Sequence, residues 1–142
     1  MKISTKGRYA LRMMIELARN YESGYMSIRE VSKRQNISVK YLEQITAALT
    51  KAGFLESTRG PKGGHRLVKK PSDYTVGDIL RVTEGDLAPI SCLQDSPNRC
   101  PRAAECTTLS FWEGLYKTIT DYCDSVTLED IAGSDSSYNY FI

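Results

Sequence analysis

The chain reads SIREVSKRQNISVKYLEQITAALTK from Ser27 to Lys51, and this stretch decides the fold because it holds two helix patterns with a short turn between them. Ser27 and Glu30 form a capping box, in which the serine hydroxyl accepts from the glutamate amide and the glutamate reaches back. The first helix stops at Gln35-Asn36-Ile37, and Ser38 caps a second helix that runs to about Lys51. This arrangement predicts a helix-turn-helix over residues 27–51.

The second helix has an apolar and a polar face. Apolar residues recur at helical spacing and are predicted to face the core: Val39, Leu42, Ile45 and Leu49. The polar face is expected to enter the major groove of duplex DNA. The residues predicted to reach base edges or phosphates are Ser38, Lys40, Tyr41, Glu43 and Gln44. Glu43 is the unusual member, because a carboxylate repels phosphate but can accept from a cytosine amino group, which would make it a selectivity element.

A β-hairpin is predicted directly after this helix. Gly53 can end the helix in a left-handed conformation, and residues 54–58 and 65–68 can pair as two strands. The turn between them, RGPKGG, supplies glycines and two cations, Arg59 and Lys62. A tip this small can approach a DNA backbone or place an arginine in a narrow minor groove. We therefore expect a DNA-binding wing, although an ordinary three-helix domain with a surface hairpin would show each piece separately.

Charge is divided unevenly along the chain. Residues 1–70, which include a first helix predicted from Ser4 or Thr5 to about Arg19, hold 15 Lys and Arg against 5 Asp and Glu. Residues 71–142 hold 4 against 12, so the net charge of +2 conceals a strong contrast. A basic half is the electrostatic footprint of a phosphate-binding surface, and it supports DNA binding by residues 1–70.

Three cysteines, Cys92, Cys100 and Cys106, lie in one polar loop after the basic half. Thiolates are soft ligands suited to iron–sulfur clusters, zinc or copper, and three within a fifteen-residue stretch can converge if the loop folds back. Their spacing is looser than the paired Cys-x-x-Cys of zinc fingers. We interpret the triplet as a metal or cluster site. The alternatives are a disulfide with one thiol left over and ordinary free thiols in a reducing cytosol.

A helix with several aromatic residues is predicted after the loop, capped by Thr107 or Thr108. Its apolar stripe recurs at threes and fours and comprises Leu109, Trp112, Leu115, Tyr116, Ile119 and Cys123. We expect this helix to form a dimer seam with Trp112 as anchor, because aromatic residues are enriched at such contacts; a core helix of a monomer would show the same stripe. Cys123 lies 17 residues beyond Cys106, about 25 Å along a helix, so it is expected to be a small packed residue rather than a ligand.

The sequence argues against several other classes of protein. No N-terminal run resembles a signal peptide, and no segment approaches the ~18 apolar residues of a membrane span, so a cytoplasmic protein with no membrane partner is expected. In a reducing cytosol, cysteines favour ligation over structural disulfides. The wing glycines lack the spacing of a phosphate-binding loop, and nothing pairs His65 with a cysteine nucleophile, so an enzyme is not expected.

Three segments carry a resemblance to a known family: Lys6-Gly7-Arg8-Tyr9-Ala10, Tyr41-Leu42-Glu43-Gln44 and the RGPKGG turn at 59–64, followed by the loop cysteines. Together they resemble the IscR-type winged-helix transcriptional regulators, a superfamily that includes NsrR and CymR, from residue 1 to about 131. The resemblance implies a homodimer that binds a pseudo-palindromic operator in double-stranded DNA. It also implies an iron–sulfur cluster on Cys92, Cys100 and Cys106, expected to be [2Fe–2S], with [4Fe–4S] left open.

The chain departs from this family at the fourth cluster ligand. In IscR a histidine three residues beyond the last cysteine completes the site, and Leu109 stands there in this chain. NsrR-like members use an acidic residue at the position that Arg8 occupies here. The one histidine, His65, lies in the wing and is expected to serve the hairpin or the DNA. The open candidates are Asp95, Glu105, an exogenous thiol or water, and an acidic residue of a partner subunit.

These observations predict a mainly α fold with a small β-hairpin wing: a winged helix-turn-helix domain plus a long C-terminal dimerisation helix. The expected division is a DNA-binding region over 1–70, a connecting helix and sensor loop over 71–107, a dimerisation helix and short helix over 108–132, and a tail over 133–142. The predicted function is a cluster-controlled regulator of iron–sulfur cluster biogenesis or a related iron, sulfur or redox response. The alternatives are a cluster-free repressor that answers to a sulfur metabolite or partner enzyme and, from another class, a cluster carrier or electron-transfer protein.

Overall fold

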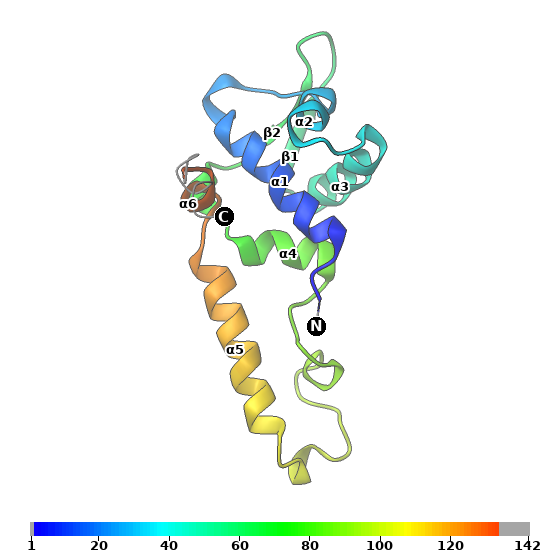
Figure 1. The fold of residues 1–142 in the computed structure, drawn as a ribbon, viewed down its shortest axis with the longest axis vertical. Helices are drawn as coiled ribbons and strands as arrows, with labels where there is room; N and C mark the ends of the chain where they lie inside the picture. The colour runs from blue at the N-terminus through cyan, green and yellow to red at the C-terminus, as the bar shows by residue number, and fades with distance from the viewer. Residues whose placement is uncertain (1, 134–142) are drawn as a thin grey trace.

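Helices dominate the computed structural model, which describes residues 2–133, and one antiparallel hairpin completes this part of the chain (Figure 1). The predicted fold class is confirmed. All but the first residue of the predicted tail lies outside the described residues. In chain order the elements are α1 (Thr5–Arg19), η1 (Tyr21–Ser23), α2 (Ile28–Gln35), α3 (Val39–Lys51), β1 (Leu55–Thr58), β2 (Gly64–Leu67), η2 (Pro71–Asp73), α4 (Val76–Glu84), η3 (Ser91–Leu93), η4 (Ala103–Glu105), α5 (Leu109–Ser125) and α6 (Leu128–Gly133).

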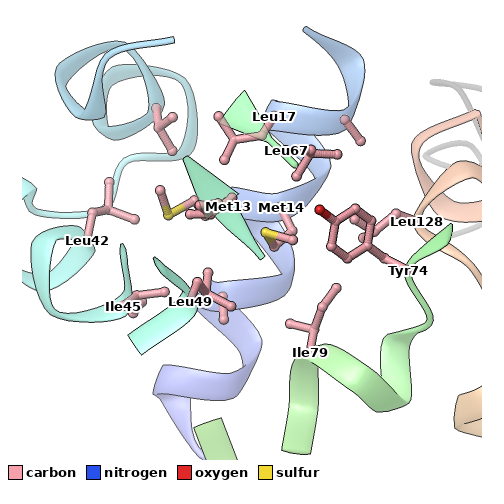
Figure 2. Close-up of a cluster of buried hydrophobic side chains, with 14 of the residues drawn as sticks. Met13, Met14, Leu17, Leu42, Ile45, Leu49, Leu67, Tyr74, Ile79 and Leu128 are labelled. Carbon is pink, nitrogen blue, oxygen red and sulfur yellow. The ribbon is translucent and has the colours of Figure 1, made fainter. Parts of the chain in front are cut away.

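The central helix, α1, supplies much of the core. Its first turn is held by Ser4, whose hydroxyl accepts from the amide of Gly7 at 3.1 Å. Met13, Met14 and Leu17 are buried along its inner face, as the 3.6-residue period requires. Buried side chains from the segments around α1 surround these three residues (Figure 2): Leu42, Ile45, Leu49, Leu67, Tyr74, Ile79 and Leu128. The core therefore joins the helix-turn-helix to the hairpin, to α4 and to α6.

The caps that predict the helix-turn-helix form, with one difference. The hydroxyl of Ser27 accepts from the amide of Glu30 at 3.1 Å, and Ser38 caps α3 in the same way. Between the two helices Asn36 adopts a left-handed conformation with φ of 53°, which ends α2. The carboxylate of Glu30 accepts from Arg34 Nε at 2.8 Å instead of reaching back to complete the predicted box. Local signals in the sequence thus predict both helices, although the Glu30 side chain binds a different partner from the one expected.

Backbone contacts fix the hairpin to the helix-turn-helix. β1 and β2 pair with Leu55 opposite Leu67. On its other side β2 meets Met26, whose N–H donates to the His65 carbonyl at 2.9 Å and whose carbonyl accepts from the His65 N–H at 2.8 Å. Gly64 has φ of +150°, and a Cβ at this position would overlap the Met26 carbonyl, so the approach requires glycine. We refer to α1, α2, α3 and this hairpin as the helix-turn-helix unit.

The second half of the chain extends away from that unit (Figure 1). α4 begins with a complete capping box between Thr75 and Asp78 and ends at Gly85, whose φ is 85°. The loop that follows leads away from the core, and α5 returns toward α6 (Figure 1). None of the 17 residues of α5 is buried. We refer to the loop over residues 85–108 together with α5 as the arm. No helix among residues 2–133 is both long and apolar enough to cross a membrane.

Candidate nucleic-acid interface and cysteine loop

The outer face of α3 is polar and exposed. Lys40, Glu43 and Gln44 are all exposed, and Ser38 stands exposed at the N-terminus of the helix. Free backbone amides and the helix dipole give such an N-terminus a partial positive charge, which favours an anion such as phosphate. Four of the five residues predicted on this helix for DNA contact therefore lie on an open surface.

Tyr41, the fifth, lies differently. Its ring is half-buried and packs edge-on against the ring of Tyr9 in α1, with centroids 5.5 Å apart. The guanidinium of Arg12 lies over the Tyr9 ring, 5.1 Å from its centroid. Tyr41 thus joins α3 to α1 and is not the fully outward side chain that the spacing predicts. On the inner face Thr46 is buried, whereas Val39 is only half-buried.

A hydrogen-bond network not predicted from the sequence holds the turn before α3. Arg12 Nε donates to Gln35 Oε1 at 2.8 Å, and the same guanidinium donates to the Gln35 carbonyl. Gln35 Nε2 in turn donates at 2.6 Å to Glu16, a carboxylate only 6% exposed. Arg34 reaches the other Glu16 oxygen at 3.5 Å, and its pKa is raised chiefly by its hydrogen bond to Glu30. The network ties α1 to the last turn of α2; the available signal was a lone carboxylate on the apolar side of α1.

The wing presents both predicted cations at its tip. Arg59 and Lys62 are exposed in the turn between β1 and β2. A groove lies between α3 and the hairpin, and its lining includes Lys51 from the helix and Ser57 and His65 from the strands. Glu43, on the outer face of α3, also lines this groove, whereas the tip residues Arg59 and Lys62 lie outside its lining.

His65 lines this groove and is partly buried. Burial lowers the pKa of its imidazole, so the neutral form is favoured. Its Nδ1 is buried and has no hydrogen-bond partner among residues 2–133. Its backbone pairs with Met26, and the hairpin lies at the opposite end of the molecule from the cysteine loop (Figure 1). His65 therefore belongs structurally to the wing.

The three predicted metal ligands are spread along the loop between α4 and α5. Cys92 lies in η3, while Cys100 precedes η4 and Cys106 follows it; the first two are half-buried and the third is exposed. All three are free thiols, and the Cys106 sulfur lies 3.5 Å from the hydroxyl of Thr108, a hydrogen bond that lowers the pKa of the thiol. Among residues 2–133 no three His, Cys, Asp or Glu side chains gather into a group that could hold a metal. The loop thus offers three thiols that this conformation does not bring together.

The arm carries large apolar side chains that the chain does not cover. Phe111 is 63% exposed and Tyr122 is 71% exposed. Their separation of eleven residues is about three helical turns, so both lie on one side of α5. Trp112 is half-buried, and its ring packs edge-on against that of Phe111 with centroids 4.9 Å apart. The predicted stripe contains Trp112 but omits Phe111 and Tyr122. Apolar side chains on a helix without buried residues mark an interaction surface.

Comparison with known proteins identifies clear relatives. The family model Rrf2, described as an iron-dependent transcriptional regulator, matches residues 3–134. The regulator CymR of Bacillus subtilis is similar to this chain at 38% identity over the full length of both, and IscR of Escherichia coli at 32% identity over 94% of this chain and 82% of its own. The solved structure of that CymR, described as the global cysteine regulator, matches with a TM-score of 0.80 over 96% of this chain and 99% of its own. The solved structure of IscR from T. potens is 37% identical and matches with a TM-score of 0.74 over 99% of this chain and 96% of its own.

Proposed function

We propose that this chain, which belongs to the Rrf2 family of transcriptional regulators, is a homodimeric repressor of a pseudo-palindromic operator. An iron–sulfur cluster on Cys92, Cys100 and Cys106 controls its affinity for that operator. Membership of the family makes it a DNA-binding regulator and not an enzyme. The observation that carries the finer proposal is the position of the three thiols, in the loop between α4 and the uncovered α5. Because its target is DNA, its expected place is the cytoplasm.

In the proposed complex the exposed face of α3 reads the major groove. Lys40 and Gln44 reach base edges or phosphates, and Ser38 brings the positive end of the helix to the backbone. Glu43 accepts from a cytosine amino group and repels sequences that lack one there. Tyr41 contributes less direct contact than the other residues, because its ring is engaged with Tyr9.

The wing holds the neighbouring part of the duplex. Arg59 and Lys62 are exposed at its tip, where they reach the backbone or the minor groove. We infer that a DNA strand passes along the groove between α3 and the hairpin, whose lining includes Lys51, Ser57 and Glu43. A cation and a hydroxyl are suitable partners for that strand's phosphates.

A second copy of the chain covers α5 in this proposal. Apolar area exposed on one side of a long helix is stabilised when a two-fold partner presents the same side. Phe111, Trp112 and Tyr122 supply aromatic surface of the kind enriched in dimer cores. A two-fold dimer places two copies of α3 about one DNA turn apart, or a multiple of it, which explains a pseudo-palindromic site.

The donor set of the loop fits an iron–sulfur cluster. Three accessible thiols, none of them in a disulfide, match the ligands that iron–sulfur clusters use, and the family is described as iron-dependent. A bound cluster supplies sensitivity to iron, oxidants or nitric oxide. Leu109 cannot act as the fourth ligand, whereas Asp95 and Glu105 are exposed carboxylates in the same loop.

The position of the loop gives the cysteines a route to the DNA. α4 contacts α1 and α3 of the helix-turn-helix unit, and the loop leads from α4 to α5. Ordering the loop around a ligand therefore changes how the two reading helices of a dimer are spaced. A ligand changes affinity only to the extent that it favours one arrangement, and couplings of this kind reach roughly 5–150-fold.

The proposal is tested by anaerobic purification followed by a visible absorption spectrum and assays of iron and sulfide per chain. Cys92→Ala, Cys100→Ala and Cys106→Ala should each lose the cluster absorbance and shift operator affinity within that range. Cys123→Ala is the matched control, because Cys123 lies in α5 away from the loop and should leave the spectrum unchanged. If all three loop variants keep the parent's iron content and operator affinity, the cluster-controlled function is wrong.

A cluster-free repressor that answers to a sulfur metabolite or a partner enzyme is the second candidate. Two observations favour it: the full-length similarity to CymR, a cysteine regulator, and the leucine at position 109 where IscR-type proteins hold a histidine ligand. On this alternative the anaerobically purified protein binds its operator without iron, and the loop variants change the response to the metabolite alone. The iron assay therefore separates the two candidates directly.

A further inference from the structure

α5 is joined to the rest of the molecule at its C-terminal end. The Val76 N–H donates to the Val126 carbonyl at 2.8 Å, and the Leu128 N–H donates to the Tyr74 carbonyl at 2.9 Å. These two backbone bonds pair the segment that leaves α5 with the segment that enters α4. They fix one end of α5 as a pivot, but a pivot alone leaves the direction of the helix free.

A bidentate ion pair lies beside this pivot. Arg81 Nη1 and Nη2 donate to the two carboxylate oxygens of Asp124 at 2.9 and 2.8 Å. The pair raises the pKa of Arg81 and lowers that of Asp124, so both groups stay charged at neutral pH. Because the planar guanidinium meets the carboxylate through two parallel bonds, the contact constrains direction as well as distance. It joins the last turn of α4 to the last turn of α5.

Gly77 provides the room for this contact. A Cβ on Gly77 would overlap the carboxylate of Asp124 and crowd Arg81. Alanine is favoured over glycine by about 1 kcal/mol in helix interiors, so helix propensity does not account for glycine in the first turn of α4. A residue without a side chain here leaves space for the Asp124 carboxylate of α5.

The remainder of α5 amplifies any change at the pivot. No residue of α5 is fully buried, and its packing within the chain is mainly against α4, so its direction is held less firmly than that of a helix in the core. From Asp124 to Leu109 the helix is about 22 Å long, and a turn of about 10° at the pivot moves its far end by roughly 4 Å. One base-pair step of DNA is about 3.4 Å. A small change of angle therefore gives a displacement comparable to the axial rise of one base pair, and a change of spacing by one base pair also turns the half-site by roughly 35° about the DNA axis.

We propose that Arg81 and Asp124 are positioning residues that set the angle of α5 against the helix-turn-helix unit and so select the half-site spacing of the operator. The inference rests on the proposed function, in which α5 forms the dimer seam. The ion pair touches no DNA. It limits the angles between the two halves of the free dimer. A larger fraction of the dimers therefore already has the arrangement that binding at the selected spacing requires.

The test begins with the full-length protein and a pool of random-sequence duplexes, from which the parent selects its operator. Three further duplexes are then made: one with a base pair added between the half-sites, one with a base pair removed, and one with a single half-site. The variants are Arg81→Met, which keeps the aliphatic stem, Arg81→Lys, which keeps the charge, and Gly77→Ala, which removes the room for Asp124. A charge exchange is avoided because Asp78 lies 3.9 Å from Arg81. Asp121→Asn is the matched control, because it breaks an exposed pair with Lys117 within the same helix.

Arg81→Met and Gly77→Ala should bind the selected operator about two- to five-fold more weakly, the range for losing an exposed ion pair. Both should also discriminate less against the altered spacings, while binding to the single half-site stays at the parent level. Arg81→Lys should lie between Met and the parent, and Asp121→Asn should match the parent. An unchanged spacing preference in Arg81→Met, or an equal loss on the single half-site, overturns the inference. A parent that is monomeric in sedimentation or selects no operator refutes the proposed function instead.

Discussion

The helix-turn-helix unit and the arm are built in opposite ways. In the helix-turn-helix unit, Met13, Leu42 and Ile45 are fully buried, and polar networks such as Glu16 with Gln35 brace the helices. The arm holds a loop of free thiols and a helix with no buried residue, on which Phe111 and Tyr122 are largely exposed. The helix-turn-helix unit is therefore packed within one chain, whereas the arm leaves apolar side chains exposed and its three loop thiols apart.

In the proposed function this difference separates DNA recognition from its control. A packed core resists deformation and keeps the outer face of α3 and the wing in one fixed relation. An arm that gains its remaining contacts from outside can respond to whatever supplies them, whether a second chain or a ligand of the thiols. Within the chain, the ion pair of Arg81 with Asp124 is one of the contacts that hold the arm to α4. Variants in the two regions should accordingly fail in different ways.

The largest expected effect comes from Trp112→Asp. A charged residue on the proposed seam should give monomers while the helix-turn-helix unit stays folded, because α5 contributes no buried residue to that unit. Loss of two-site binding should weaken operator affinity by about 100-fold or more. Sedimentation and operator binding measure the two effects, with Glu113→Ala as the control on the neighbouring exposed position. A dimer of unchanged stability would remove Trp112 from the interface and leave the arm without its proposed partner.

The next effect compares one leucine from each region. Leu42→Ala leaves a cavity in the helix-turn-helix unit and should cost about 2–5 kcal/mol in the free energy of unfolding. Leu115 is half-buried on α5, and Leu115→Ala should lower the free energy of unfolding much less at concentrations where the protein is monomeric. Its cost should grow with concentration as the dimer forms. Urea unfolding at two concentrations distinguishes the cases. Equal, concentration-independent losses would show that α5 is packed within its own chain.

The same contrast explains how far the sequence leads. The helix-turn-helix follows from local signals, because Ser27, Ser38 and Asn36 act on amides only a few residues away. The contacts of Tyr41 and Glu16 cannot be predicted in this way. Their partners, Tyr9 and Gln35, belong to other helices, and no spacing in the sequence indicates these pairs.

Periodicity finds part of the surface of α5. All six residues of the predicted stripe, Trp112 and Ile119 among them, are half-buried, so the spacing identifies the less exposed face of the helix. Phe111 and Tyr122 lie outside this stripe and are largely exposed. The cysteines raise a similar limit, because their spacing shows which ligand atoms are available but not when the loop brings them together.

A smaller effect is expected at the wing tip. Arg59→Ala should lose about 1–3 kcal/mol of operator affinity and relax selectivity if the guanidinium reads bases, whereas Lys62→Ala should weaken all sequences alike and reduce the salt slope by about 1. Both side chains are exposed, so neither change should alter stability. Lys70→Ala removes a cation from an exposed position beyond the hairpin and serves as the control. If both tip variants bind the operator as tightly as the parent does, at low and at high salt, the wing does not contact DNA.

The smallest effect concerns pH and lies within the wing. Burial lowers the pKa of His65, so the unfolded chain binds a proton more readily than the folded one as pH falls below the ordinary value of about 6.5. The free energy of unfolding should therefore decrease as pH falls through 6.5 toward the lowered pKa. This decrease should be smaller than the ~1–3 kcal/mol of operator-binding free energy expected to be lost in Arg59→Ala. His65→Phe removes the titrating group and the unpartnered Nδ1, so its unfolding free energy should change less between pH 7 and pH 5.5. His65 is the chain's one histidine, and the pKa of Asp124 lies below its ordinary 3.8, outside that interval. Urea unfolding of both proteins under reducing conditions measures the difference, and parallel pH profiles would show that the imidazole is not buried in the folded wing.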